Sequence, residues 1–215
     1  MGVTLLDTVK APCDGEGVTT SGATRALGAQ RLLDAALTEI AGAPNGPGEV
    51  SLRSIARRAG LSHNAAQHHF GDRAGLFTAA AATGFTELGD RLEQAVEGAG
   101  PGTGESLRAS GRAYLAFGLA EPNLLELMFR SDLLRTDDPD LNAARQRAFA
   151  LLERSVPAAG PNAGSPDSAL VAWAFIHGLV GLSRHGALPT DPDRPDTAQR
   201  VATAFADLLS PMDDR

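Results

Sequence analysis

Apolar side chains recur every three or four positions along most of the chain, which is the spacing that gives an α-helix one buried face. The sequence has no stretch in which apolar and polar residues alternate as a half-buried strand requires. The pattern therefore predicts an all-α protein. The expected helices span residues 25–41, two short segments within 51–70, 73–98, 105–119, 122–134, 139–155, 167–185 and 195–209.

Residues 51–70 have the pattern of two short helices joined by a tight turn. Ser51 and Ser62 each stand where a hydroxyl group can cap the following helix. Gly60 lies at the turn, where glycine adopts a left-handed backbone without steric cost. Ala56 is small enough for two helices to cross closely. The side chains expected to point inward with it are Ile55, Ala59, Leu61, Ala66 and Phe70. This combination predicts a helix-turn-helix.

The second of these helices leaves polar side chains on its outer face. They can donate and accept hydrogen bonds at the edges of DNA bases. These residues are His63, Asn64, Gln67 and His68. A helical hairpin without a DNA-binding role could share the spacing, but the caps, the glycine and the polar face together favour DNA binding.

The charge of the 215-residue chain is unevenly divided. Its net charge is −7, yet residues 51–73 contain four arginines and a single aspartate, which leaves −10 on the remainder. Binding to phosphates depends on the charge of the docking face rather than on the total. The acidic remainder is expected to weaken non-specific DNA binding.

Other function classes find little support in the sequence. Residues 98–104 are glycine-rich but lack the lysine of a phosphate-binding loop, so we interpret them as a linker. No Gly-x-Ser-x-Gly turn is present, and the histidines do not have metal-ligand spacing, so we expect no enzyme, no metal and no cofactor. The single cysteine, Cys13, and the lack of a membrane-length apolar run or signal peptide predict a cytoplasmic protein without membrane contact.

Composition divides the chain into three parts. Residues 1–23 are rich in Gly, Thr and Ser and are expected to form a disordered arm. Residues 24–72 form the predicted DNA-binding domain. Residues 73–215 form a larger helical body that begins with a connector helix at about 73–97.

Several motifs together resemble the TetR family of bacterial transcriptional regulators. The resemblance is carried by RLLDAAL, SLRSIARRAGLS and HHFGDRAGLF within residues 31–77. The segments AYLAFGLAEPNLLELMF and WAFIHGLVGL resemble a subgroup whose C-terminal domain is named for a Trp…His-Gly motif, here Trp173, His177 and Gly178. The resemblance implies a homodimer with a DNA-reading head and a body that encloses an effector.

The resemblance also implies individual DNA contacts. His69 and Arg73 match positions that usually touch backbone phosphates, and Gln67 replaces a tyrosine that commonly does so. An amide can instead pair with adenine in bidentate fashion, so we expect Gln67 to contribute sequence discrimination. The complete candidate set for DNA is Ser51, Arg53, Ser62, His63, Asn64, Gln67, His68, His69 and Arg73.

The helices at 167–185 and 195–209 are predicted to form the dimer interface. The first is apolar on nearly all sides, so several of its faces need a cover, and Gly178 and Gly181 permit close approach of another helix. Large apolar side chains could also line a pocket for a small, mainly apolar effector. They are Tyr114, Phe117, Met128, Phe129, Phe149, Trp173 and His177. The alternative is that they are plain core, with His177 bonded to a backbone carbonyl.

These observations predict a ligand-responsive regulator that binds a near-palindromic double-stranded operator as a homodimer. That it acts as a repressor is implied by the family resemblance alone. The alternative is a helical protein-interaction module whose DNA-binding head is degenerate. A salt-dependent, sequence-selective interaction with DNA separates the two.

Overall fold

The computed structural model describes residues 17–157, 165, 167–190, 193 and 196–210, and within them every regular element is a helix. The all-α class predicted from the sequence is therefore confirmed. The helices are α1 (Gly17–Ala41), the 3₁₀ helix η1 (Pro47–Glu49), α2 (Leu52–Arg58), α3 (His63–Phe70), α4 (Arg73–Ala99), α5 (Gly104–Ala120), α6 (Pro122–Met128), α7 (Pro139–Ser155), α8 (Ser168–Arg184) and α9 (Thr197–Leu209).

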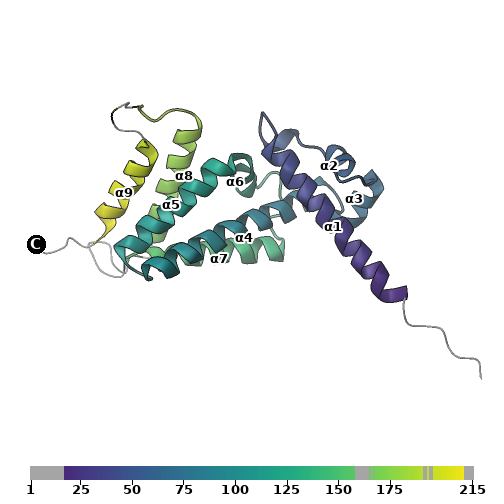
Figure 1. Ribbon diagram of the computed structural model, residues 1–215, viewed down its shortest axis with the longest axis horizontal. Coiled ribbons are helices and arrows are strands. Elements are labelled where there is room, and N and C mark those ends of the chain that lie inside the picture. The colour runs from purple at the N-terminus through teal and green to yellow at the C-terminus, as the bar shows by residue number, and fades with distance from the viewer. Residues whose placement is uncertain (1–16, 158–164, 166, 191–192, 194–195, 211–215) are drawn as a thin grey trace, which may run out of the picture.

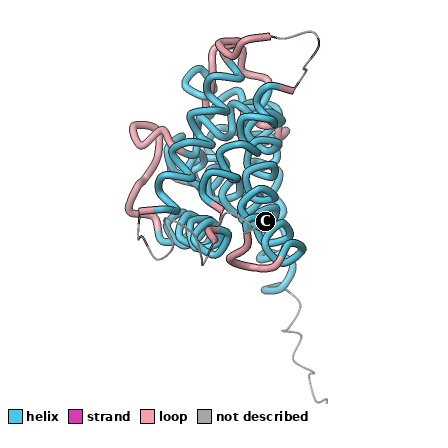
Figure 2. Tube along the Cα trace, turned by 90° about the vertical axis from the view of Figure 1, so that its left-hand side faces the viewer, coloured by secondary structure: helices cyan, strands magenta, loops and turns pink. Residues whose placement is uncertain are grey.

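The helices form a small head and a larger body that are joined by α4 (Figure 1). Helices α1, α2 and α3 make the head at one end of the molecule. Helix α4 leads from the head into the body, where it packs along α5 and α7. Helices α8 and α9 lie at the far end, and the view turned by 90° shows the same stack of helices (Figure 2).

The connector α4 owes its position to one apolar stripe. All eight side chains that the sequence places on this stripe are buried. Such burial removes apolar surface from water and stabilises the fold by about 25 cal/mol per Å². The buried stripe consists of Leu76, Phe77, Ala80, Ala81, Phe85, Leu88, Leu92 and Val96. The stripe therefore fixes one face of α4 against the rest of the body.

Helix α1 begins earlier than expected. The sequence assigned residues 1–23 to a disordered arm, but the helix starts at Gly17, so residues 17–23 are helical. Extending an existing helix adds a hydrogen bond for each residue that is ordered, which weakens the effect of a poor helix-forming composition. Residues 1–16, the rest of this arm, lie outside the described part of the chain.

Helix α6 ends at Met128, six residues before the predicted end at 134. The Arg130 guanidinium binds the carboxylate of Asp132 at 2.8 and 2.9 Å. Residues two positions apart do not face each other on an α-helix, so this pair belongs to a turn. The turn places Leu134 in the core, which satisfies the apolar pattern that had suggested a continuing helix.

Polar contacts of Asn123 and Arg135 join the head to the body. The amide of Asn123, on α6, donates to the carbonyl oxygens of Ile40 and Ala43 at the end of α1, at 3.0 and 2.8 Å. The guanidinium of Arg135 lies 3.1 Å from the carboxylate of Asp72, the residue that caps α4. The position of α6 is thereby tied to the position of the head.

Candidate DNA-binding surface and ligand cavity

The helix-turn-helix has the caps and the turn that the sequence predicts. The Ser51 hydroxyl accepts from the backbone N–H of Ser54 at 3.0 Å, and the Ser54 hydroxyl accepts from the N–H of Ser51, which forms a capping box. The Ser62 hydroxyl accepts from the N–H of Ala65 at 3.1 Å. Gly60 has a φ of 65°, the left-handed conformation expected at the turn.

The interior of the motif also agrees with the prediction. Ile55, Ala56, Ala59 and Ala66 are buried where α2 and α3 pack together, with Leu61 and Phe70 partly buried beside them. The Arg31 side chain, from α1, donates to the carbonyl of Ala59 and so satisfies an oxygen at the end of α2. Helix α3 is therefore held in the head by the packing of its apolar side chains.

The outer face of α3 is open to solvent. Its side chains His63, Asn64, Gln67 and His68 are all exposed, as is Arg53 on α2. Arg25, from α1, reaches this face, with its Nη2 3.3 Å from Nε2 of His68. The sequence gives no sign of that neighbour, because the two residues are 43 positions apart and only the fold brings them together.

Two of the expected phosphate contacts are partly engaged within the head. The Arg73 guanidinium donates to the carbonyl oxygens of Gly48 and Val50 at 3.0 and 3.2 Å and lies over the ring of Phe77. The ring of His69 lies against α1 at Gly28. Arg73 thus holds the loop before α2 in place, which positions the supporting helix.

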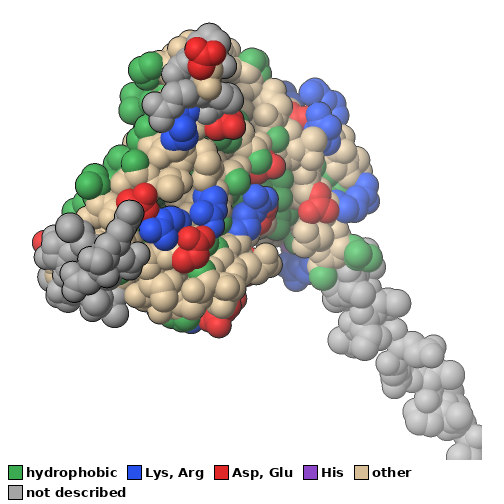
Figure 3. All heavy atoms as spheres, turned by 60° about the vertical axis from the view of Figure 1, so that its left-hand side comes forward, with side chains coloured by type: hydrophobic (Ala, Val, Ile, Leu, Met, Phe, Trp, Pro, Cys, Tyr) green, Lys and Arg blue, Asp and Glu red, His purple; other side chains and the backbone are tan. Residues whose placement is uncertain are grey.

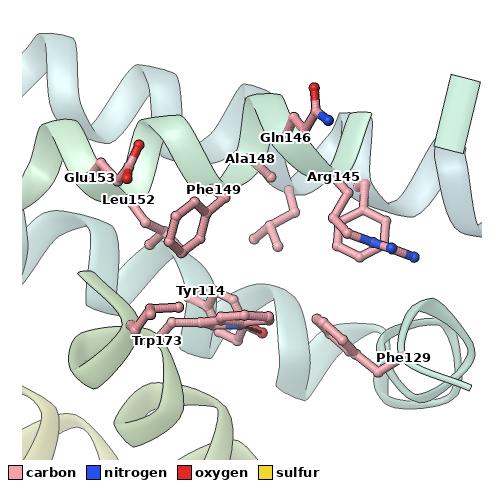
Figure 4. A pocket seen from close by; sticks show the side chains of 12 residues that line it. Tyr114, Phe129, Arg145, Gln146, Ala148, Phe149, Leu152, Glu153 and Trp173 are labelled. Carbon is pink, nitrogen blue, oxygen red and sulfur yellow. Dashed lines mark hydrogen bonds between the residues drawn. The ribbon is translucent and has the colours of Figure 1, made fainter. Parts of the chain in front are cut away.

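The body contains a cavity of about 490 Å³ between α4, α5, α7 and α8, with the end of α6 at one side (Figure 4). That volume is within the range of about 300–1,000 Å³ that is typical of small-molecule sites. The residues that line it are Phe85, Leu88, Tyr114, Phe129, Arg145, Gln146, Ala148, Phe149, Leu152, Glu153, Leu170 and Trp173.

Four of the seven expected pocket residues line this cavity, namely Tyr114, Phe129, Phe149 and Trp173. Phe117 and Met128 do not line this cavity, because both are fully buried core residues that contact neighbouring helices. His177 lies in contact with Phe129 and borders a smaller cavity of about 210 Å³.

The sequence analysis missed the contribution of α7 to the cavity. Arg145, Phe149 and Glu153 follow one another at intervals of four residues, which places them on one side of a helix. This spacing is visible in the sequence, but the expected pocket set contains only Phe149 from α7, because charged side chains are not expected in a mainly apolar pocket.

The polar atoms at the base of the cavity bind one another. The indole N–H of Trp173 donates to the Tyr114 hydroxyl at 3.2 Å, and that hydroxyl lies 3.0 Å from Nδ1 of His177. Burial lowers the pKa of His177, which favours the neutral ring, and burial raises the pKa of Tyr114, which keeps its proton. Tyr114 can therefore donate to His177. The histidine is bonded to this hydroxyl and not, as expected, to a backbone carbonyl.

Helices α8 and α9 carry large apolar side chains that face solvent. Their exposed fractions are 49% for Val171, 50% for Leu182 and 75% for Leu208. Hydrophobic side chains gather along the edge of the body that these helices form (Figure 3). A Cβ atom added at Gly178 or Gly181 would meet no heavy atom within 4 Å, so the space in front of α8 is open.

In the described part of the chain, no group of three or more His, Cys, Asp or Glu side chains is arranged to hold a metal ion. Among the described helices, none combines the length and the apolar character needed to cross a membrane.

The sequence matches two family profiles that correspond to the head and the body. Residues 32–80 match the profile described as "Bacterial regulatory proteins, tetR family", and residues 107–205 match "Tetracyclin repressor-like, C-terminal domain". The chain belongs to the TetR family. As a TetR-family protein it is a DNA-binding transcriptional regulator, and its helix-turn-helix lies within the first matched segment.

Solved structures agree with this TetR-family assignment. A protein of unknown function from Rhodococcus sp. RHA1 is 33% identical, with a TM-score of 0.70 and coverage of 85% of this chain and 93% of that one. The regulator LfrR from Mycobacterium smegmatis, solved in complex with proflavine, is 19% identical with a TM-score of 0.58, over 84% and 92% of the two chains. PfmR from Thermus thermophilus is 23% identical with a TM-score of 0.55, over 84% and 96%. No curated protein matches the sequence.

Proposed function

We propose that this TetR-family protein is a ligand-responsive repressor that binds a near-palindromic operator as a homodimer. The observation that carries the proposal is the exposed polar face of α3 on a fully capped helix-turn-helix. In this role residues 24–72 read the DNA, and residues 73–215 bind the effector and dimerise. Its chemistry is binding rather than catalysis, and we place it in the cytoplasm, where the operator is.

The proposed dimer forms through α8 and α9. Val171, Gly178 and Leu182 recur at intervals of seven and four residues, so they lie on one side of α8. Val171 and Leu182 are exposed in the single chain, and an apolar stripe of this kind needs a cover. A twofold axis beside α8 would pair the stripe with its own copy and present two heads to successive major grooves.

The proposed ligand response follows from the position of α6. Phe129, at its end, lines the cavity, and Asn123, near its start, holds the end of α1. A ligand that favours another position of α6 would move the head and so change the spacing of the two reading helices. The relative LfrR was solved with proflavine, and EbrR is described as a multidrug binding protein, which supports a small-molecule effector here.

The proposal is tested by footprinting the purified protein on DNA upstream of its own gene and neighbouring genes, across a salt series. We expect a protected site with two symmetric halves, whose affinity falls steeply as the salt concentration rises. Weak protection that is uniform along the DNA and disappears near physiological salt would contradict the proposal. It would favour the interaction-module alternative.

Gln67→Ala tests whether this residue reads sequence. Gln67 is exposed on α3, and a bidentate amide–adenine pair is worth about 1–3 kcal/mol of discrimination. We therefore expect the variant to bind the native operator and operators mutated in single base pairs with more equal affinities, measured by titration of labelled duplexes. Unchanged affinity ratios over the whole operator series would exclude base reading by Gln67.

A further inference from the structure

Within the described part of the chain, Arg145 differs from two other arginines of α7 in having no ionic partner. The Arg147 guanidinium binds Asp90 and Glu93 on α4 at 2.7 and 2.6 Å, and the Arg154 guanidinium binds Glu97. Among the described residues no carboxylate lies within 4 Å of the Arg145 guanidinium, which rests instead over the ring of Phe85, 5.5 Å from its centre. Arg147 and Arg154 thus link α7 to α4 through ion pairs, while Arg145 faces the cavity.

The charges around the cavity are not balanced. Arg145 is half-buried, and its guanidinium points into the space beside Phe129 (Figure 4). Glu153, two helical turns further along α7, is exposed, and its carboxylate turns away from the cavity. Water therefore screens the carboxylate of Glu153, whereas the guanidinium of Arg145 is partly removed from water.

Gln146 also lines the cavity, but it is exposed and its amide points away from the cavity (Figure 4). The polar groups of Tyr114 and Trp173 are already hydrogen-bonded. Trp173 donates to Tyr114, and Tyr114 can donate to His177, so neither ring needs a partner from a ligand. Arginine has five N–H donors and no acceptor, and it stays protonated at any ordinary pH. The guanidinium of Arg145 is the strongest hydrogen-bonding group that the cavity offers to a ligand.

We propose that the cavity binds an amphipathic anion, with its acidic group on Arg145 and its apolar body along Phe149 and Trp173. This inference rests on the proposed function, in which the cavity holds the effector. Positions 145 and 153 are separated by about 12 Å along α7, at 1.5 Å per residue. A medium-chain carboxylate has the required shape, since it combines one anionic end with an apolar body. A neutral ligand would bury the guanidinium without a counter-charge, which is unfavourable.

The test uses Trp173, the only tryptophan in the sequence, as an internal probe. Octanoate and decanoate are titrated into the full-length protein at about pH 7.5, where carboxylates are ionised, and their primary amides serve as neutral analogues of the same length. We expect the carboxylates to change the tryptophan fluorescence with at least about tenfold tighter binding than the amides, which corresponds to about 1.4 kcal/mol.

Variants of α7 then show which residue distinguishes the two ligands. In Arg145→Gln the preference for the carboxylate should fall to about one, while Arg145→Lys should keep part of it because the charge remains. The control is Arg154→Gln, which removes the same charge from the same helix but outside the cavity, and it should keep the full preference.

Three results would overturn the inference. If amide and carboxylate bind alike and Arg145→Gln changes neither, the cavity is a ligand site but Arg145 does not select its charge. If octylammonium binds more tightly than octanoate, the preferred charge is the opposite one. If no probe changes the fluorescence of Trp173, the cavity does not bind this class of ligand. The footprint measures DNA binding independently, so a failure here is distinguishable from a failure of the regulator proposal.

Discussion

Replacing Asn64 with alanine is expected to weaken operator binding by about a hundredfold or more. Asn64 is exposed in the first turn of α3, where side chains reach the bases first. A bidentate asparagine–adenine pair contributes about 1–3 kcal/mol, and each 1.4 kcal/mol is about a factor of ten in affinity. A symmetric dimer loses this contact in both half-sites. Titration of a labelled operator at fixed salt measures the loss.

The control for this substitution is Asn45→Ala. Asn45 is an exposed asparagine of the same head, but it lies in the loop between α1 and α2 and its amide binds Glu49. We expect this variant to keep operator affinity within about twofold, and both variants to keep the circular dichroism and melting temperature of the parent. If Asn64→Ala binds as tightly as Asn45→Ala, α3 does not read the operator through this residue.

The double substitution Val171→Asp, Leu182→Asp is expected to convert the dimer into monomers. In the proposed interface each chain would bury two unpaired carboxylates, and each such charge costs several kcal/mol. In the monomer both positions face solvent, so the fold itself should change little. Sedimentation velocity at micromolar concentration measures the assembly. The affinity for the operator should fall when the dimer is lost, because a single head makes half of the contacts with DNA.

Leu27→Asp is the matched control for assembly. Leu27 is 65% exposed on α1, so the substitution places a carboxylate on an apolar surface position far from α8 and α9. The dimer should persist in this variant. A Val171→Asp, Leu182→Asp protein that sediments as a dimer would mean that the chains associate through another surface.

The fold was largely predictable because its elements satisfy local rules and tertiary packing at once. The hydrophobic stripe of α4 is buried along its whole length, and the caps at Ser51 and Ser62 form where the sequence placed them. Helix α7 spans Pro139–Ser155 as expected. The helix begins directly after a capping residue and ends before Val156, whose backbone is extended. The local sequence therefore determines both ends of the helix.

The cavity was only half predictable, and the reason is geometric. Tyr114 and Phe117 both belong to the apolar face of α5, yet one lines the cavity and the other lies in the core. Hydrophobic periodicity tells which face of a helix is buried, but not whether the space in front of it is filled. The end of α6 was missed for a related reason, since Leu133 and Leu134 continue the apolar pattern beyond the last helical turn.

The division of charge between the two ends of the molecule bears on how the protein finds DNA. Residues 17–73, which include the head, carry six arginines and four carboxylates, a net +2, whereas residues 74–215 carry 12 arginines and 19 carboxylates, a net −7. Since the head lies at one end, the protein has an electric dipole along its length (Figure 1). In the field of a DNA duplex a torque acts on that dipole, turning the reading helices toward the duplex and the body away from it. Orientation is then selected before contact, so a larger share of encounters begins with α3 facing the groove.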